Sequence, residues 1–257
     1  YPVTIDPLIT SEVIKLTASD GDAGDVFGSD VAVSGDTLLV SSNWDNGGPV
    51  GKVYVFQRNV GSVDGWGLVT GIENPGSLAG EQFLQALDLD GDTAVVCSYQ
   101  TTSLRSFHIF ERNQGGADAW GEVVANSSTA KNFCTAVAID RSTIVVGAPP
   151  TTSTGGKAFV YERNQGGVNA WGQVAQIDNP TTTSYDYFGW SVDIDGDTIL
   201  IGNRAADIDA DGAEEGAAYV FERNVGGAEA WGLVQRLDSS DGSEWREFAV
   251  AVALDGD

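Results

Sequence analysis

The chain repeats one order of sequence segments four times, and this internal repeat limits its fold more than any other feature. Each unit opens with a Phe before a short alternating segment, continues to a segment that ends in Arg-Asn, and closes at Trp-Gly. The opening Phe residues recur at steps of 50 to 60 residues, at Phe27, Phe83, Phe133, Phe188 and Phe248. The other two markers keep this rhythm, at Arg58, Arg112, Arg163 and Arg223 and at Trp66, Trp120, Trp171 and Trp231. Such a period indicates a repeat architecture, in which each unit buries its core only against its neighbours.

The unit from Phe188 to Gln235 shows what one repeat contains. The alternating segment FGWSVDIDGD includes Asp195-Gly196, a pair suited to a tight hairpin, and TILIGN, GAAYVFERN and WGLVQRL follow. Four strand-like segments without a helical period predict a four-stranded antiparallel meander. Meanders arranged radially form a β-propeller. We therefore predict an all-β propeller of four-stranded antiparallel blades, with a single-sheet solenoid or a row of sandwiches as the alternative.

We expect one propeller array over residues 1–257, with full blades at about 27–69, 83–123, 133–174 and 188–234. Partial blades at 11–18 and 248–257 flank them, the first as an outer strand and the second as an innermost strand. A ring needs whole blades, so we expect either that another segment completes the closing blade or, as we favour, that the protein is longer. The Trp-Gly tryptophans are expected to be packing residues, because large aromatic side chains bury well.

The composition is strongly acidic, with 37 Asp and Glu against 13 Lys and Arg and a net charge of −24. This balance argues against a nucleic-acid partner, because such binding depends on Lys and Arg neutralising phosphates. It suits divalent cations instead. The longest apolar run, FAVAVAL, falls well short of the ~18 residues of a membrane span, so we expect no span in this chain. The chain begins with Tyr1 and contains no Met, which fits a mature secreted protein; glycosylation of the sequon at Asn126 stays open.

Two cysteines, Cys97 and Cys134, replace glycines of the repeat. One interpretation is a pair of buried small hydrophobic residues. The other is a disulfide between adjacent blades, which an oxidising compartment would permit. On either interpretation we expect neither cysteine to be a reactive thiol, because the sequence around both is neutral or apolar.

The sequence offers little to support an enzyme, and we predict that the chain is not one. Its one histidine, His108, occupies a repeat position that holds Tyr54, Phe159 and Tyr219 in the other units, so we expect a packing role. A zinc site is not expected without a second histidine or a cysteine-rich cluster. No pair of carboxylates suited to glycoside cleavage stands out from the turn residues.

The segment from Asp207 to Glu215 predicts a calcium site. Its D-x-D-x-D-G pattern places carboxylates at Asp207, Asp209 and Asp211, with the carbonyl of Ala213 and the carboxylate of Glu215 following. Ca²⁺ takes six to eight oxygen ligands, and such a loop supplies most of them from one short segment. The alternative is a solvated acidic loop. The equivalent connections of the other blades lack this pattern, so we expect one structural calcium ion of this type.

The repeats resemble FG-GAP repeats, the blades of the integrin α-subunit propeller and of many microbial extracellular proteins. The resemblance rests on FGSDVAVSGDTLLV, FGWSVDIDGDTILIG and IVVGAPP, each followed by a YVFER-like strand, and it covers residues 11 to 257. Phe-Gly is intact at Phe27-Gly28 and Phe188-Gly189, whereas blade two departs most. The resemblance implies a propeller, usually of seven blades, that serves adhesion, ligand display or assembly outside the cell. It also implies a calcium loop in the connection before Gly216.

These observations favour an extracellular, calcium-binding propeller that acts as an adhesion, ligand-binding or protein-interaction module. We expect a protein or glycan ligand outside the cell, bound by loops that vary on a repeated frame. The competing hypothesis is a structural subunit that self-assembles or joins a larger complex, such as a filament, a cell wall or a surface layer. A propeller domain of a secreted hydrolase is a minor alternative.

Overall fold

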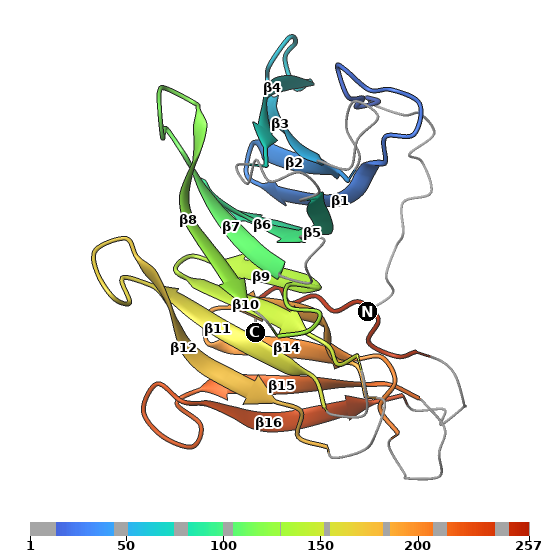
Figure 1. Cartoon of the computed structure of the whole chain (residues 1–257), viewed down its shortest axis with the longest axis vertical. Helices are drawn as coiled ribbons and strands as arrows, with labels where there is room; N and C mark the ends of the chain where they lie inside the picture. The colour runs from blue at the N-terminus through green and yellow to red at the C-terminus, as the bar shows by residue number, and fades with distance from the viewer. Residues whose placement is uncertain are drawn as a thin grey trace, which may run out of the picture.

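The computed structural model describes residues 14–43, 51–74, 82–99, 105–128, 130–151, 155–181, 186–207, 215–239 and 247–256, and their regular structure is entirely β-strand. The strands form four sheets, each of four antiparallel strands in the order of the chain. In Figure 1 the sheets follow one another from top to bottom, with the sequence. The predicted all-β array of four-stranded propeller blades is confirmed.

The blades have the following strands. Blade 1 holds β1 (Phe27–Ser34), β2 (Thr37–Ser42), β3 (Lys52–Arg58) and β4 (Trp66–Glu73). Blade 2 holds β5 (Gln82–Asp90), β6 (Thr93–Tyr99), β7 (Arg105–Arg112) and β8 (Trp120–Ser128). Blade 3 holds β9 (Ala136–Asp140), β10 (Thr143–Ala148), β11 (Lys157–Arg163) and β12 (Trp171–Asp178). Blade 4 holds β13 (Phe188–Asp195), β14 (Thr198–Asn203), β15 (Ala217–Arg223) and β16 (Trp231–Asp238).

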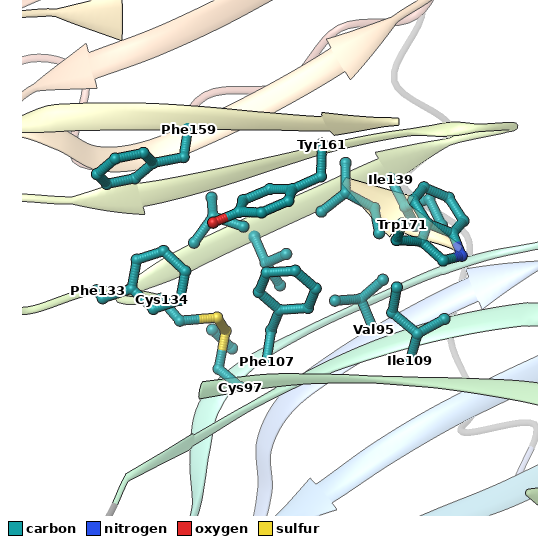
Figure 2. Packing of buried hydrophobic residues seen from close by; sticks show 14 of the residues in the cluster. Val95, Cys97, Phe107, Ile109, Phe133, Cys134, Ile139, Phe159, Tyr161 and Trp171 are labelled. Atoms are coloured by element: carbon teal, nitrogen blue, oxygen red, sulfur yellow. A yellow bond between two sulfur atoms is a disulfide. The ribbon is translucent and has the colours of Figure 1, made fainter. Parts of the chain in front are cut away.

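The hydrophobic core lies between the faces of successive blades. Between blades 2 and 3, Phe107 meets Tyr161 edge to face, with ring centroids 4.9 Å apart (Figure 2). Phe133 packs on Phe159 in the same cluster at 5.6 Å, and Trp171, expected as a packing residue, is 5 % exposed there. Similar clusters join blades 1 and 2 and blades 3 and 4. Each sheet therefore buries both apolar faces only by having neighbours, as the repeat predicts.

The glycine of the Phe188-Gly189 pair lets the innermost strand of blade 4 approach blade 3 closely. Gly189 has a φ of 87°, and a Cβ built there would lie 2.4 Å from the carbonyl oxygen of Lys157 in blade 3. Cys134 takes this place in blade 3, also at positive φ (59°), and β9 begins only at Ala136, later than the expected start at Phe133.

In blades 2, 3 and 4, an arginine at the end of the third strand ties the blade to the one before. The guanidinium of Arg163 lies 5.0 Å from the ring centroid of Trp171, and its Nη1 is 2.6 Å from Glu111 Oε1 in blade 2. Its Nη2 donates to Thr93 Oγ1 of blade 2 at 3.2 Å. The equivalent contacts are those of Arg112 with Trp120 and Thr37, and of Arg223 with Trp231, Glu162 and Thr143. The Arg and Trp positions of the repeat therefore act together to connect neighbouring blades.

The innermost hairpin of each blade accepts a backbone amide from the next blade. Asp140 Oδ2 of blade 3 accepts the N–H of Gly196 in blade 4 at 2.8 Å. The residues equivalent to Asp140 and Gly196 make the same contact at three more junctions. There the side chain accepts and the backbone N–H of the next unit donates, in the pairs Ser34 with Gly91, Asp90 with Arg141, and Asp195 with Gly256. Side chains that read in sequence as turn residues therefore also fix the register between blades.

A second aspartate bridges three of the four junctions. Asp88 Oδ1 accepts the N–H of Leu89 at 2.8 Å, and its Oδ2 accepts the N–H of Ile139 in blade 3 at 2.7 Å. Asp193 bridges Ile194 and Leu254 in the same way, and Asp30, two positions earlier in its repeat, bridges Val31 and Leu87. Burial raises the pKa of Asp88 to about 6, and it also raises the pKa values of Asp30 and Asp193.

The two flanking segments form no strand in the described residues. Leu16 and Ala18 pack against the face of blade 1 that holds Val40, Tyr54 and Phe56. Residues 247–256 lie beside β13, where Leu254 and Gly256 donate to Asp193 and Asp195. The segment 247–256 nevertheless makes the hydrogen bonds of an innermost strand to blade 4.

The buried carboxyl of Asp88 predicts a pH dependence of stability. Its pKa of about 6 lies above the ordinary value of 3.8, so the folded state holds the proton more tightly between these values. Stability conferred by this proton is therefore present at low pH and is lost as pH rises through about 6. Compared with Asp88→Asn, which cannot ionise, the wild-type chain should gain melting temperature as pH falls from 7.5 to 5. Thermal unfolding at several pH values measures this difference, and a constant difference across the range would contradict it.

Candidate functional site

The predicted calcium loop joins β14 to β15, and the structure describes its two ends. The carbonyl oxygen of Ala206 accepts the N–H groups of Glu215 at 3.1 Å and Gly216 at 3.0 Å, which closes the base of the loop. Asp207 therefore begins the loop directly beside the residue that ends it, and Glu215 is 4 % exposed. The other predicted ligands, Asp209, Asp211 and Ala213, lie outside the described residues. Among the residues that are described, no three His, Cys, Asp or Glu side chains gather in a metal-holding arrangement.

The base of this loop is anchored by Arg204. Its guanidinium lies 4.3 Å from the ring centroid of Tyr187 and 4.2 Å from that of Trp190, and Nη1 is 2.5 Å from Glu247 Oε1. Cation–π contacts of this kind are favourable at partly desolvated sites. Beside it, Asn203 is fully buried, and neither its Oδ1 nor its Nδ2 has a hydrogen-bond partner in the described part of the chain. A buried amide without partners is costly, and it leaves an oxygen available to a ligand.

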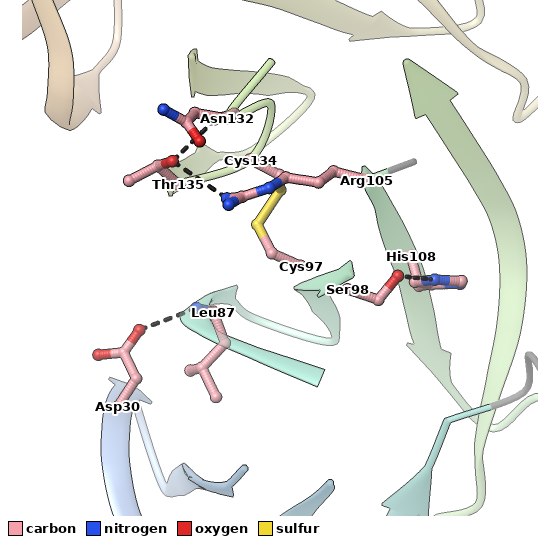
Figure 3. The surroundings of a disulfide bond; sticks show 9 residues. All are labelled: Asp30, Leu87, Cys97, Ser98, Arg105, His108, Asn132, Cys134 and Thr135. Carbon is pink, nitrogen blue, oxygen red and sulfur yellow. Dashed lines mark hydrogen bonds between the residues drawn. A yellow bond between two sulfur atoms is a disulfide. The ribbon is translucent and has the colours of Figure 1, made fainter. Parts of the chain in front are cut away.

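His108 occupies the aromatic position expected from the sequence, and it also belongs to a chain of hydrogen bonds that the sequence did not predict. Its ring lies among aromatic rings, 6.2 Å from Phe83 and 6.4 Å from Phe110. Its Nε2 is 2.8 Å from Ser98 Oγ, and its Nδ1 is 2.6 Å from Glu122 Oε1. Figure 3 shows the serine contact. One feature of the sequence could have indicated this chain of hydrogen bonds: blade 2 has polar residues at both repeat positions, Ser98 and Glu122. Blade 3 has Ala148 at the first position, and blade 1 has Leu68 at the second.

The order serine, histidine, carboxylate is that of a catalytic triad, yet the burial of this chain points to structure. Ser98 is fully buried and His108 is 4 % exposed. A nucleophile must meet the substrate carbonyl directly, so a serine hydroxyl enclosed in the sheet is not placed for acyl transfer. The three side chains come from β6, β7 and β8, and they link these strands of blade 2.

The two cysteines are bridged. Cys97 at the end of β6 and Cys134 just before β9 have Cα atoms 5.6 Å apart, and both are fully buried. The interpretation as a disulfide between adjacent blades is confirmed. The bridge joins blade 2, at the end of β6, to blade 3, just before β9 (Figure 3).

Two cavities lie at this end of the junction between blades 2 and 3. One, of about 260 Å³, is lined by Tyr99, Arg105, Lys131, Asn132 and Thr151. The other, of about 280 Å³, shares Lys131 and Thr151 and extends to Pro150 and Lys157. The sequence did not predict these cavities, because residues of two different blades line them.

Comparison with known proteins supports the resemblance stated from the sequence. The family model of the FG-GAP repeat matches residues 10–56 and 171–221. The second match begins at the first residue of β12 and ends within β15, so the sequence repeat is offset from the blade and contains the predicted calcium loop. No curated protein matches the chain. None of the described segments forms a helix with the length and hydropathy of a membrane span.

Proposed function

Because the chain carries FG-GAP repeats and folds into propeller blades, we propose that it is an extracellular, calcium-stabilised binding module. The observation that carries the binding role is the pair of cavities at the junction of blades 2 and 3. A ligand pocket is a cleft with a few convergent polar groups on a largely preformed frame. Here a disulfide and a packed core hold the frame, and the connections that border the cavities differ in every repeat.

The extracellular location is supported by the disulfide. Disulfides persist in oxidising compartments and are rare in the cytosol. Cys97 and Cys134 are fully buried on a packed interface, so the bridge belongs to the folded core of the junction. FG-GAP repeats are typical of extracellular proteins, in agreement with this location.

If the loops bind the ligand, shortening one loop should abolish binding. The purified chain, with calcium present, would be passed over immobilised matrix proteins and neutral and acidic polysaccharides. We expect retention by at least one of these. In a matched variant, a two-residue Asn-Gly hairpin replaces residues 149–156 and preserves the pairing of Ala148 with Lys157. This variant should fold and lose retention; no retention of the wild type, or equal retention of both, would contradict the proposal.

The calcium role rests on the loop from Asp207 to Glu215. The carboxylates of Asp207, Asp209, Asp211 and Glu215 and the carbonyl of Ala213 would hold the ion, and the ion would neutralise carboxylates that otherwise repel one another. The residues fit a hard cation, since the base of the loop is closed by hydrogen bonds and the buried Oδ1 of Asn203 has no other partner there. The ion would stiffen the longest connection of blade 4.

Calcium should therefore stabilise the folded chain. At free calcium 100 times above the dissociation constant, ligand linkage adds roughly 2.7 kcal/mol to the free energy of unfolding. Excess EGTA should lower the melting temperature of the wild type, whereas Asp209→Ala should remove this sensitivity. Glu73→Ala, which changes an exposed carboxylate at the end of β4, serves as the matched control and should keep it. An unchanged melting curve of the wild type in EGTA would refute the calcium site.

A further inference from the structure

Three of the 13 basic residues gather around the two cavities between blades 2 and 3. Arg105 and Lys131 line one cavity, and Lys131 and Lys157 line the other. Lys157 is 2.5 Å from Asp178 Oδ1, so its charge is neutralised locally. In a chain of net charge −24, basic side chains are expected to pair with carboxylates. Within the described part of the chain, Arg105 and Lys131 form no such pair.

Arg105 is the exception among the described arginines. Each of the other seven forms an ion pair with Asp or Glu. Arg105 instead donates from Nη1 to Thr135 Oγ1 at 3.3 Å, and its guanidinium lies 5.6 Å from the ring centroid of Tyr99. Burial lowers its pKa, which records the cost of removing this charge from water. A half-buried guanidinium beside a cavity is a strong donor set for an anion.

The groups around Arg105 are fixed in place before any ligand arrives. Thr135 donates to the carbonyl oxygen of Asn132 at 2.8 Å, so the acceptor of Arg105 is itself positioned (Figure 3). Tyr99 lies two residues after Cys97, and Thr135 directly follows Cys134, so the disulfide joins the two sides of this cavity. Such preorganisation reduces the entropy lost on binding.

The described residues that line the two cavities include no Asp or Glu. Among the described residues that line the cavities, Asn132 and Thr151 carry groups that both donate and accept hydrogen bonds. The hydroxyl groups of a sugar also do both, whereas Arg105 and Lys131 can only donate.

We propose that this junction is a binding site for a carboxylated saccharide, with the sugar carboxylate on Arg105 and Lys131. This inference rests on the proposed binding function and assigns its ligand class. Asn132 and Thr151 would bind the hydroxyls, and the Tyr99 ring supplies an apolar wall. A ligand with one to a few charges fits better than a long polyanion, because the net charge of the protein repels a polyanion outside the local site.

Calorimetric titration of the full chain with trigalacturonate tests this proposal. We expect saturable binding, at least tenfold weaker in Arg105→Gln, partly kept in Arg105→Lys, and unchanged in Arg236→Gln, which alters an arginine paired with Asp238 on β16. The methyl ester of the same oligosaccharide should not bind. Should Arg105→Gln fail to fold, Lys131→Gln, at an exposed position, should weaken binding severalfold.

Several outcomes would overturn the assignment. These are no binding of trigalacturonate to the folded wild type, equal affinity of Arg105→Gln, or equal binding of the ester. Tighter binding of a short glutamate-rich peptide would assign the site to acidic peptides instead, and tighter binding of inorganic sulfate would exclude a carboxylate site. If the wild type is retained by a neutral glycan or a matrix protein while trigalacturonate does not bind, the binding function stands and this ligand assignment alone fails.

Discussion

The free edge of each innermost strand is the constraint on which the array depends. An innermost strand pairs with one neighbour only, so its outward N–H groups need acceptors from elsewhere. Here the acceptors are side chains of the preceding blade, such as Asp88 for Ile139 and Asp140 for Gly196. These bonds set the spacing at which the sheet faces stack, and hence where the connections of adjacent blades meet.

The fold could be predicted from the repeat, because equivalent residues form the strands and pack between the sheets in every blade. The alternation around Phe188, the hairpin at Asp195-Gly196 and the Arg and Trp positions are local patterns, and the strands follow them closely. The roles of Asp88 and Asp140 at the junctions were not predictable. Their partners lie 51 and 56 residues away, and a turn aspartate looks the same whether or not a neighbouring amide reaches it.

The candidate sites also differ in whether a single segment of the sequence could predict them. The calcium site proposed at Asp207 to Glu215 rests on a pattern within one loop, and the structure adds that the base of this loop is closed. Neither the Ser98–His108–Glu122 chain nor the cavity beside Arg105 could be predicted from a single segment. Each depends on residues that separate strands or blades bring together. The lack of a carboxylate beside Arg105 among the described residues likewise depends on its surroundings rather than on its own sequence position.

Native-state hydrogen exchange tests most directly whether side chains of one blade satisfy the innermost strand of the next. The account predicts that the amides of Leu87, Ile139 and Leu254 exchange far more slowly than that of Val63, which is 86 % exposed in a turn. In Asp88→Ala, the amide of Ile139 should lose this protection while that of Leu254 keeps it. Exchange of all three amides at the rate of Val63 in the wild-type protein would contradict the account.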